Sequence, residues 1–490
     1  MLGTIWHVTV PNGSVTLFLG ASPFKIPVEK EKLPPKCSKD CNFLFRRGSL
    51  SYRSPAFSQE FFFQSSGGSR LEVAANREEL SQFFCLDTCS YTNLYVFSGI
   101  FIVGAKRTPF GTYGGVFKGK SAMELQTVAA VAALKQAKVS PDKVDTVVIG
   151  NVLVSSAPDG AFLPRHVSLR CGIPIDRPAL GVNRLCGSGF QAVVSGAQDI
   201  LSGSAQISLT GGCDNMSQAP YAVRNVRFGT VLGAPISFED TLWVGLTDSY
   251  CKLPMALTAE NLAEQYKIPR QEVDNFALRS QKRWKAAHDA GYFNEECAPV
   301  TVSIKRKDVE IKQDEHPRPE TTIEGLAKLA TVFKKDGVVT AGSASGICDG
   351  AGAIVLASEE ALKAESLTPL ARLAGWASVG VDPKIMGIGP VNAILNVLKA
   401  TKLTLNDIDL IEINEAFGVQ TLACAQALKL DMEKLNVNGG AIALGHPLAA
   451  SGARITAHLV HELKRRGLKR GIGAACIGGG QGIALLIELP

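Results

Sequence analysis

Three segments of the sequence place a nucleophile or a base beside glycine-rich turns. In the first, Asn183-Arg-Leu-Cys-Gly-Ser-Gly, Cys186 precedes a predicted helix that runs to about Leu201. A thiol at a helix N-terminus faces the positive end of the helix dipole, which predicts a lowered pKa for Cys186 and a reactive thiolate. A small buried cysteine is the ordinary alternative, and the local sequence leaves both interpretations open.

The second segment holds His446 between a glycine and a proline, on a loop before a helix predicted to begin near Ser451. A histidine held in this way can act as a base toward a nearby nucleophile. His458 and His461 fall on the following helix, where they are interpreted as ordinary core or surface residues.

The third segment is Ala474-Ala-Cys-Ile-Gly-Gly-Gly-Gln-Gly, in which Cys476 comes immediately after a predicted strand. The backbone N–H groups of such a glycine turn can donate hydrogen bonds to a developing oxyanion. Ile483 stands where the dinucleotide-binding pattern G-x-G-x-x-G needs its last glycine, so that pattern does not apply.

The elements around these segments form a regular α/β pattern from Gly99 onward. The chain also repeats itself: residues 133–145 resemble residues 397–409, each followed by an apolar strand, and residues 183–187 resemble residues 414–418. Such a duplication predicts two related α/β halves, each built around a sheet. The clearest predicted elements are a strand at 100–103, a helix at 121–138, a strand at 144–149, and charged helices at 260–266 and 272–287.

Taken together, the three segments resemble the active-site motifs of the thiolase superfamily. Arg107-Thr-Pro-Phe-Gly and Asn414-Glu-Ala-Phe recur in the same order, and the resemblance runs from about Gly99 to Leu489. It implies a thiolase-like α/β fold, in which duplicated halves pack as layered sheets and helices around an inserted loop domain. The implied division is 1–98 as an unmatched N-terminal extension, 99–215 with 341–367 as the N-terminal core, 216–340 as a loop domain for CoA and substrate, and 368–490 as the C-terminal core.

The segments around Gln218, Val223 and Ser280 most closely resemble the mitochondrial branch of the family that acts on 3-ketoacyl-CoA. The resemblance implies an acyltransferase that cleaves 3-ketoacyl-CoA with CoA, through an acyl-cysteine, into acetyl-CoA and a shortened acyl-CoA. This is the last step of fatty-acid β-oxidation, and its reverse is a Claisen condensation. CoA is then a co-substrate, and no permanently bound cofactor or metal is expected.

The resemblance also implies roles for individual residues. Cys186 attacks the 3-keto carbonyl, His446 activates it and helps to bind the thioester oxygen, and Cys476 exchanges a proton with the acetyl-CoA carbanion. Asn414 positions a water in a first oxyanion hole, and the backbone N–H groups of Cys186 and Gly478 form a second one. The positions that match CoA contacts of the family are Arg318, Thr321 and Ser345.

Four positions depart from the family pattern. Ala449 and Ala450 stand where glycine is usual, and Asp214 and Ser343 replace the usual Glu and Asn. None of these changes removes a reacting group, so they bear on efficiency and specificity and leave the reaction class intact.

Composition and charge limit the partners of the chain. Its 490 residues are 46% hydrophobic, enough to bury more than one core. The net charge is +6, and positive and negative residues are mixed along the chain. This mixture disfavours a nucleic-acid groove, and the mild positive balance suits a polyanionic small ligand. No apolar run reaches the roughly 18 residues that a membrane helix needs. The pairs Cys37/Cys41 and Cys85/Cys89 are loosely spaced without a nearby histidine, so they are interpreted as unrelated thiols in a reducing compartment.

The first 98 residues match nothing in the family. They carry both arginines and glutamates, and so meet the acid-poor pattern of a mitochondrial transit peptide only in part. An extension, a targeting region and an artefact of the gene prediction all stay open. The chain ends without a Ser-Lys-Leu-type peroxisomal signal. The resemblance favours the mitochondrial matrix, with cytosol and peroxisome as open alternatives, and implies a homo-oligomer, either a dimer or a tetramer.

Several other functions compete with this hypothesis. Residues 114–121 match the P-loop pattern, but a Pro-containing stretch separates them from the preceding strand, so a nucleotide hydrolase is a remote alternative. An acetoacetyl-CoA thiolase is a nearer one, because pocket shape sets the acyl-chain preference. A non-enzymatic acyl-CoA binder would need neither Cys186 nor Cys476. Decarboxylating condensing enzymes are characterised by a Cys-His-His set. This chain has Asn414 and Cys476 at the two positions other than that of the first cysteine.

Overall fold

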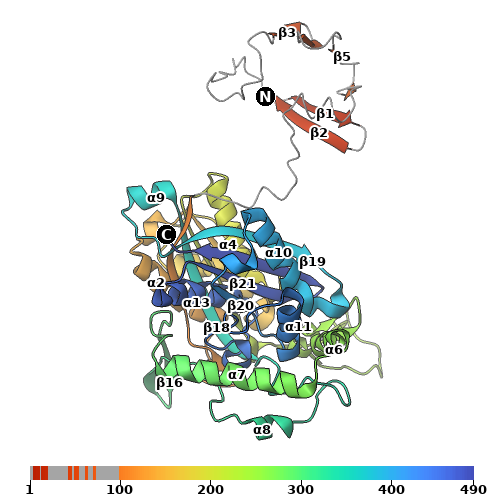
Figure 1. Cartoon of the computed structure of the whole chain (residues 1–490), viewed down its shortest axis with the longest axis vertical. Coiled ribbons are helices and arrows are strands. Elements are labelled where there is room, and N and C mark those ends of the chain that lie inside the picture. Colours follow the sequence, from red (N-terminus) through yellow and green to blue (C-terminus); the bar gives the residue numbers. More distant parts are fainter. Residues whose placement is uncertain are drawn as a thin grey trace. The chain divides into compact units, whose positions relative to one another are not determined.

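The computed structural model describes residues 99–490 throughout, and before them only the backbone of six short strands (Figure 1). Contacts divide the chain into two units, Met1–Tyr91 and Thr92–Pro490, and the predicted finer division stays a prediction. Cys37, Cys41, Cys85 and Cys89 lie outside the described residues. The six strands of the first unit form the sheets β2-β1-β6 and β3-β4-β5, with bounds β1 Thr4–Val10, β2 Gly13–Leu19, β3 Asn42–Arg46, β4 Ser49–Arg53, β5 Phe61–Gln64 and β6 Arg70–Glu72.

The second unit contains one continuous strand order, β10-β9-β11-β18-β7-β19-β22-β21-β20, with β8 paired to β18. Its two halves meet where β7 pairs with β19, through Ile102–Ala371 and Phe101–Arg372 alone. The strands of the first half are β7 Ile100–Arg107, β8 Gly111–Thr112, β9 Thr146–Gly150, β10 Ala179–Val182, β11 Ile207–Asn215 and β18 Cys348–Ser358. Those of the second half are β19 Ala371–Gly380, β20 Leu410–Ile413, β21 Arg470–Ile477 and β22 Gln481–Glu488.

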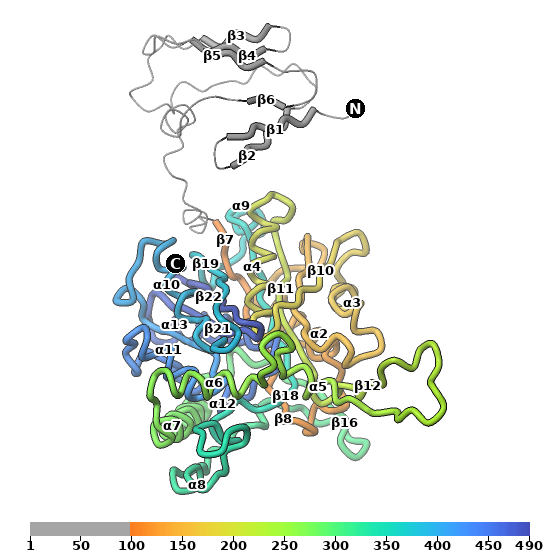
Figure 2. Tube along the Cα trace, turned by 90° about the vertical axis from the view of Figure 1, so that its right-hand side faces the viewer, coloured from red at the N-terminus to blue at the C-terminus, as the bar shows by residue number. Residues whose placement is uncertain are grey.

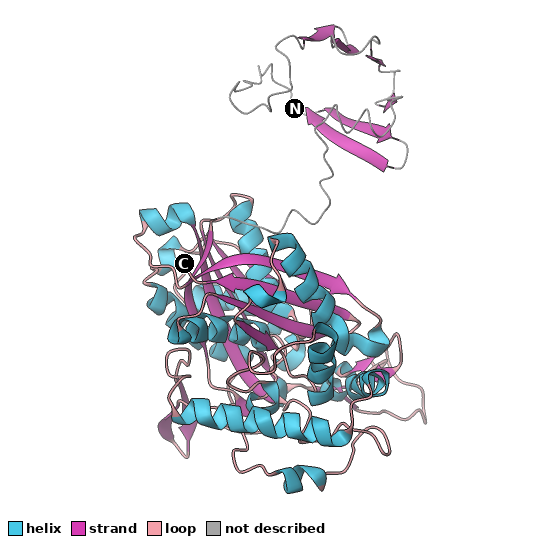
Figure 3. Cartoon of the chain, in the orientation of Figure 1, coloured by secondary structure: helices cyan, strands magenta, loops and turns pink. Residues whose placement is uncertain are grey.

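Two helices lie between the halves, and others cover the outer faces. Phe190 of α4 and Ile455 of α13 belong to one core cluster with Ile354 of β18 and Leu485 of β22. The two halves of the sheet therefore enclose α4 and α13 and carry other helices on their outer faces, in agreement with the predicted layered α/β fold (Figure 3). The helices of this unit's core are α2 Ala122–Ala137, α3 Leu163–Arg170, α4 Ser188–Leu201, α9 Glu359–Ala364, α10 Gly389–Thr401, α11 Gly418–Leu428, α12 Ala441–Leu444 and α13 Ala450–Arg466.

The predicted duplication is visible in atomic detail. Both α2 and α10 end on a lysine in the left-handed region, Lys138 at φ 56° and Lys402 at φ 57°. In each half an aspartate then precedes the strand and accepts two backbone N–H bonds from the start of a neighbouring strand. Asp145 binds Gln206 and Ile207, and its counterpart Asp409 binds Lys469 and Arg470.

The second predicted repeat, 183–187 with 414–418, does not correspond in the topology. Asn414 follows β20, whose parallel partner is β21. In the first half the matching strand is β9, parallel to β11, and the residue after it is Asn151. Cys186 instead precedes α4, the helix that packs beside α13. Short motif likeness misassigned this pair because both segments are turns that open a helix.

The inserted region, 216–340, adds no described strand to the main sheet. Figure 1 shows its long helix α7 crossing below the sheet, and the connection between β12 and β13 projects from the body in Figure 2. No described helix is long and apolar enough to cross a membrane. The elements are α5 Thr241–Gly245, α6 Met255–Tyr266, α7 Arg270–Asp289 and α8 Ile323–Ala327, with the hairpins β12 Tyr221–Ala222/β13 Glu239–Asp240, β14 Thr247–Asp248/β15 Leu253–Pro254 and β16 Val300–Ile304/β17 Lys307–Ile311.

Candidate active site

Cys186 lies in a tight turn between β10 and α4. Leu185, the residue before it, has a φ of 46°, in the left-handed region that a branched side chain rarely adopts. The turn is held by Ser188 Oγ, which accepts from Arg184 N at 2.9 Å and donates to the Leu185 carbonyl at 2.6 Å. Asn183 Oδ1 accepts from Leu185 N at 3.0 Å. This short-range bonding fixes the direction in which the thiol projects.

The predicted lowering of the Cys186 pKa is wrong. Burial raises the pKa of this thiol to about 11, and the charge of Asp214 adds to the rise. Hydrogen bonds from the backbone N–H groups of Gly478 and of Cys186 itself oppose the rise but do not cancel it. The first helical residue of α4 is Ser188, so the thiol lies before the helix, and its loss of hydration outweighs the helix dipole.

His446 lies on the loop between α12 and α13, buried on every side. Its backbone N–H donates to the Gly346 carbonyl at 2.9 Å. Its ring lies between two side chains, with Nδ1 2.6 Å from Ser451 Oγ and Nε2 3.4 Å from Asn414 Nδ2. Burial, with a smaller contribution from Arg454, lowers the pKa of His446 to about 3, so the imidazole is neutral in the resting protein. With Asn414 donating, Nε2 is the ring atom that accepts.

Asn414 follows β20 and is fully buried. Its backbone N–H donates to Ala474 O at 2.9 Å, which ties it to the strand that carries Cys476. Its Oδ1 has no hydrogen-bond partner among residues 99–490. A buried amide oxygen without a protein partner is the acceptor that an ordered water or a substrate donor needs.

Cys476 is the second-last residue of β21, so the predicted end of this strand, just before Cys476, was two residues too early. It pairs with Gly482 across the hairpin to β22 and is fully buried. Burial raises the pKa of its thiol, and the nearby Cys186 and Cys424 thiols raise it further. The hairpin turn needs glycine, because Gly479 and Gly480 have φ of 76° and 81°. The same turn brings the Gly478 N–H to the sulfur of Cys186.

Asp214 and Ser451 were not among the predicted site residues. Asp214 Oδ1 accepts from the backbone N–H groups of Val152 and Leu153, at 3.0 and 2.8 Å. Its Oδ2 accepts from Ala449 N at 2.7 Å, at the start of α13. Burial raises the pKa of Asp214 to about 7 in spite of these bonds. The available signals were an acidic residue at the end of a buried strand and a hydroxyl five residues after His446.

Apolar side chains surround the two thiols. Cys186 packs in a cluster with Met216, Leu242 and Leu448, and Cys476 packs with Met386 and Ala416. Met216 and Leu242 belong to the inserted region, which therefore supplies part of the wall beside Cys186. An apolar wall suits an acyl chain.

The predicted CoA-contact residues lie on two segments. Arg318 is exposed, its backbone N–H donates to Gln281 Oε1 at 2.9 Å, and its carbonyl accepts from Thr321 Oγ1 at 2.6 Å. Ser345 is half-buried, and its backbone N–H donates to Ala416 O at 3.0 Å. Arg318 and Thr321 thus share one turn of the inserted region, whereas Ser345 bonds to Ala416, two residues after Asn414.

The segment with the P-loop pattern has a structural role at the start of α2. Ser121 caps α2 in a capping box with Glu124, and Lys120 pairs with Glu124 at 3.2 Å. The hydroxyl and the ammonium that would serve magnesium and phosphate are thus engaged with the helix start. No group of three or more metal-ligating side chains occurs within the part of the chain that the structure describes.

Comparison with known proteins covers the whole second unit. Residues 100–360 match the family model of the thiolase N-terminal domain, and residues 367–489 match that of the thiolase C-terminal domain. The mitochondrial 3-ketoacyl-CoA thiolase of Homo sapiens is 60% identical over 390 residues, 80% of this chain and 98% of that protein. An acetyl-CoA acetyltransferase of Syntrophomonas wolfei is 43% identical over 393 residues, 79% of this chain and 98% of that protein.

Solved structures agree. The crystal structure of human mitochondrial 3-ketoacyl-CoA thiolase in complex with CoA has a TM-score of 0.79 and 59% identity, and covers 81% of this chain and 100% of that one. The acetyl-CoA acetyltransferase of Bacillus anthracis has a TM-score of 0.78 and 45% identity, and covers 80% of this chain and 99% of that one.

Proposed function

The chain belongs to the thiolase family, and on that premise we propose how its residues cleave 3-ketoacyl-CoA. It is an acyltransferase, with CoA as co-substrate, that converts 3-ketoacyl-CoA into acetyl-CoA and an acyl-CoA shortened by two carbons. The 60% identity to the human mitochondrial enzyme carries this assignment, and the alternative of an acetyl-CoA acetyltransferase rests on relatives of lower identity, 43% in the first of them.

Cys186 attacks C3 of the substrate, and its proton passes to the neutral Nε2 of His446. The C2–C3 bond then breaks, leaving the acyl group on Cys186, and the acetyl-CoA carbanion takes the proton of the Cys476 thiol. In the second half-reaction the thiol of CoA attacks the acyl-cysteine and its proton restores the Cys476 thiol. Cys186 leaves as a thiolate and recovers its proton from His446. The neutral resting states of all three groups support this order of proton transfers.

Two sets of donors face the developing negative charges. His446, once protonated, and a water bound by Asn414 stabilise the thioester oxygen of the carbanion. The backbone N–H groups of Cys186 and Gly478 stabilise the oxyanion at C3. The Gly478 N–H supports this second assignment, because it acts on the Cys186 thiol and lowers its pKa against the effect of burial.

CoA binds, in this proposal, along Arg318, Thr321 and Ser345. An exposed guanidinium suits a phosphate group. Ser345 lies close to the catalytic centre, since its N–H binds Ala416 beside the Asn414 segment. The pantetheine thiol would thus approach from the inserted region toward the core.

The compartment and the assembly are part of the proposal. Relatives that are 60% identical to the chain are named mitochondrial enzymes, which supports the mitochondrion, and within it we propose the matrix. An exposed apolar connection between β12 and β13 favours a homo-oligomer. Fluorescent fusions of the full chain and of residues 99–490 test the compartment, and a cytosolic signal from both would reject a mitochondrial enzyme.

Thiolysis rates with 3-ketoacyl-CoA substrates of graded length test the reaction and its range. We expect CoA-dependent loss of substrate from several chain lengths, and none in a Cys186→Ala control. Activity on acetoacetyl-CoA alone would favour the acetyltransferase alternative. No thiolysis of any length by a correctly folded protein would contradict the family function.

A further inference from the structure

The loop with the P-loop pattern binds an anion from its own chain. Glu315 Oε2 accepts from Thr112 N at 2.9 Å and from Val116 N at 3.0 Å. A Cβ added at Gly115 would overlap that carboxylate oxygen, so the glycine permits the close approach. Val116, one of the two donors, lies within the 114–121 segment and 199 residues from Glu315, so the carboxylate binds where the P-loop pattern would place a phosphate.

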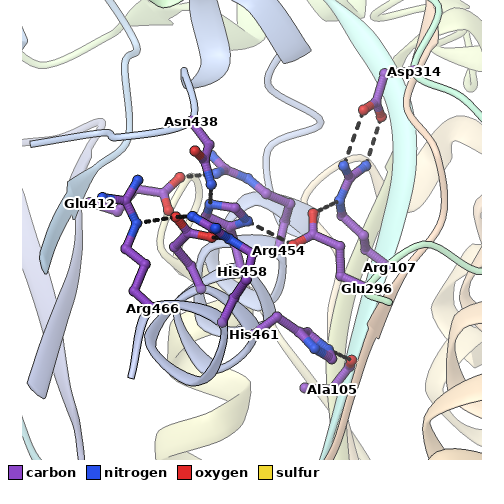
Figure 4. Close-up of polar contacts among 12 residues, drawn as sticks. Ala105, Arg107, Glu296, Asp314, Glu412, Asn438, Arg454, His458, His461 and Arg466 are labelled. Carbon is purple, nitrogen blue, oxygen red and sulfur yellow. Dashed lines mark hydrogen bonds and ion pairs between the residues drawn. The ribbon is translucent and has the colours of Figure 1, made fainter. Parts of the chain in front are cut away.

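The residue before Glu315 is anchored to the same segment of the core. Asp314 receives two bonds from the Arg107 guanidinium, at 2.7 and 3.1 Å, and a third from Phe110 N at 2.9 Å. Arg107 is fully buried and also binds Glu296 at 2.6 Å (Figure 4). Arg107 therefore holds two carboxylates of the inserted region at once.

The residue after Glu315 reaches the catalytic loop. His316 Nδ1 lies 3.4 Å from Thr112 Oγ1, and a Cβ added at Gly346 would overlap the His316 ring. The carbonyl of Gly346 accepts the backbone N–H of His446 at 2.9 Å. Three consecutive side chains, Asp314 to His316, thus fasten the inserted region to residues 107–116 and to Gly346, which in turn bonds to His446.

The fastened segment runs directly into the predicted CoA turn. Prolines at 317 and 319 flank Arg318 and restrict its backbone, so the position of Glu315 is transmitted to Arg318 over three residues. We propose that Glu315, held by the backbone amides of residues 112–116, is a positioning residue that sets the affinity for CoA through the Arg318–Thr321 turn. This inference rests on the proposed CoA contacts of Arg318 and Thr321.

The test compares Glu315→Ala, Glu315→Gln and Gly115→Ala in the full chain, with Glu310→Ala as control. Glu310 lies five residues earlier in an exposed ion pair with Lys312. Titration calorimetry with CoA, steady-state kinetics and hydrogen exchange of residues 314–321 are the readouts. Loss of a charged hydrogen-bonded anchor should weaken CoA binding about tenfold in Glu315→Ala, with kcat at saturating CoA within about twofold.

Glu315→Gln should recover most of the affinity, because its amide oxygen can still accept both N–H bonds. Gly115→Ala should behave like Glu315→Ala, since it displaces the carboxylate from the loop. Unchanged CoA affinity in Glu315→Ala and Gly115→Ala, or a fall in kcat without a change in affinity, would overturn the inference.

Hydrogen exchange tests the role of Glu315 independently of the proposed CoA contact of Arg318. Faster exchange of residues 314–321 in Glu315→Ala without CoA supports the anchor whether or not Arg318 contacts CoA. An Arg318→Ala variant with unchanged CoA affinity contradicts the proposed CoA contact. Unchanged exchange in Glu315→Ala overturns the anchor even where Arg318 proves to bind CoA.

Discussion

At the scale of single residues, the candidate active site is a set of neutral groups. Burial raises the pKa of Cys186 to about 11 and lowers that of His446 to about 3. A thiolate–imidazolium pair would need the opposite shifts. The proposed nucleophile is therefore activated only when substrate is present, by proton transfer to His446 during attack.

This resting state predicts the pH dependence of alkylation. Below its pKa a thiol gains thiolate about tenfold per pH unit. Iodoacetamide labelling of Cys186 should therefore rise steadily from about pH 7 to about pH 10 without a plateau. His446, neutral across this range, should add no step. Mass spectrometry of the Cys186 peptide gives the rates, and a plateau near neutral pH would show an ion pair instead.

Mutation should distinguish the functions of the two thiols, Cys186 and Cys476. Cys476→Ala should keep stoichiometric acylation of Cys186 by acetyl-CoA, because transfer to the first thiol needs no carbon acid. It should lose exchange of the acetyl-CoA methyl protons with deuterated water. Exchange at the wild-type rate would move the carbon base elsewhere, with His446 the next candidate, and Cys186→Ala controls for acylation at other thiols.

The donors of the first oxyanion hole should matter unequally. Removal of one such donor typically lowers turnover by about 10²–10³. Asn414→Ala should fall in that range, and His446→Ala should lose more, because it also removes the base. Steady-state kinetics measure both, and near-normal turnover in either variant contradicts the role of that residue.

At the scale of elements, the site depends on how closely α4 and α13 approach. A Cβ at Gly452 would overlap the backbone N of Phe190, and one at Gly189 would overlap the Ala449 carbonyl. The two proposed catalytic partners precede these helices, Cys186 before α4 and His446 before α13. Asp214 ties the end of β11 to the first turn of α13 through Ala449.

Gly452→Ala should therefore separate the helices. Overpacking at such a contact costs about 1–3 kcal/mol of the free energy of unfolding. Denaturant titration measures the loss, and thiolysis should fall with it. Gly380→Ala is the matched control, with no atom within 4 Å of the added Cβ, and should stay within about 0.5 kcal/mol. Equal stability of the two variants would contradict the close approach.

At the scale of the whole molecule, the connection between β12 and β13 stands out. It exposes five large apolar side chains, Phe228, Val231, Leu232, Ile236 and Phe238. A patch of this kind on a water-exposed loop marks an interaction surface. The proposed homo-oligomer would bury it between copies of the chain.

A double variant, Phe228→Ser with Leu232→Ser, should reduce the assembly size without unfolding the core. Light scattering after size exclusion compares it with the wild type, whose subunit mass is 52.0 kDa. Val131→Ser, an exposed apolar position on α2, is the control. A wild-type monomer, or an unchanged assembly in the double variant, would contradict the proposed interface.

The sequence alone determined the reaction class and much of the local structure. The helix predicted at 121–138 is α2, Ala122–Ala137, with the two predicted end residues as its caps: Ser121 forms a capping box with Glu124, and Lys138 adopts the left-handed conformation. The 133–145 repeat predicted the duplication because the same short-range bonds close both copies. Local bonding of this kind depends on neighbours in sequence, so it can be predicted from them.

Tertiary structure alone decided the state and the surroundings of the site. The Cys186 pKa moved opposite to the prediction because burial removes hydration from the sulfur, and this burial depends on distant residues such as Met216 and Leu448 that pack around it. The Gly114–Ser121 loop looked like a phosphate site, yet its anion is Glu315. Spacing identifies groups able to react, but burial and long-range partners, which spacing does not encode, set their charge and their contacts.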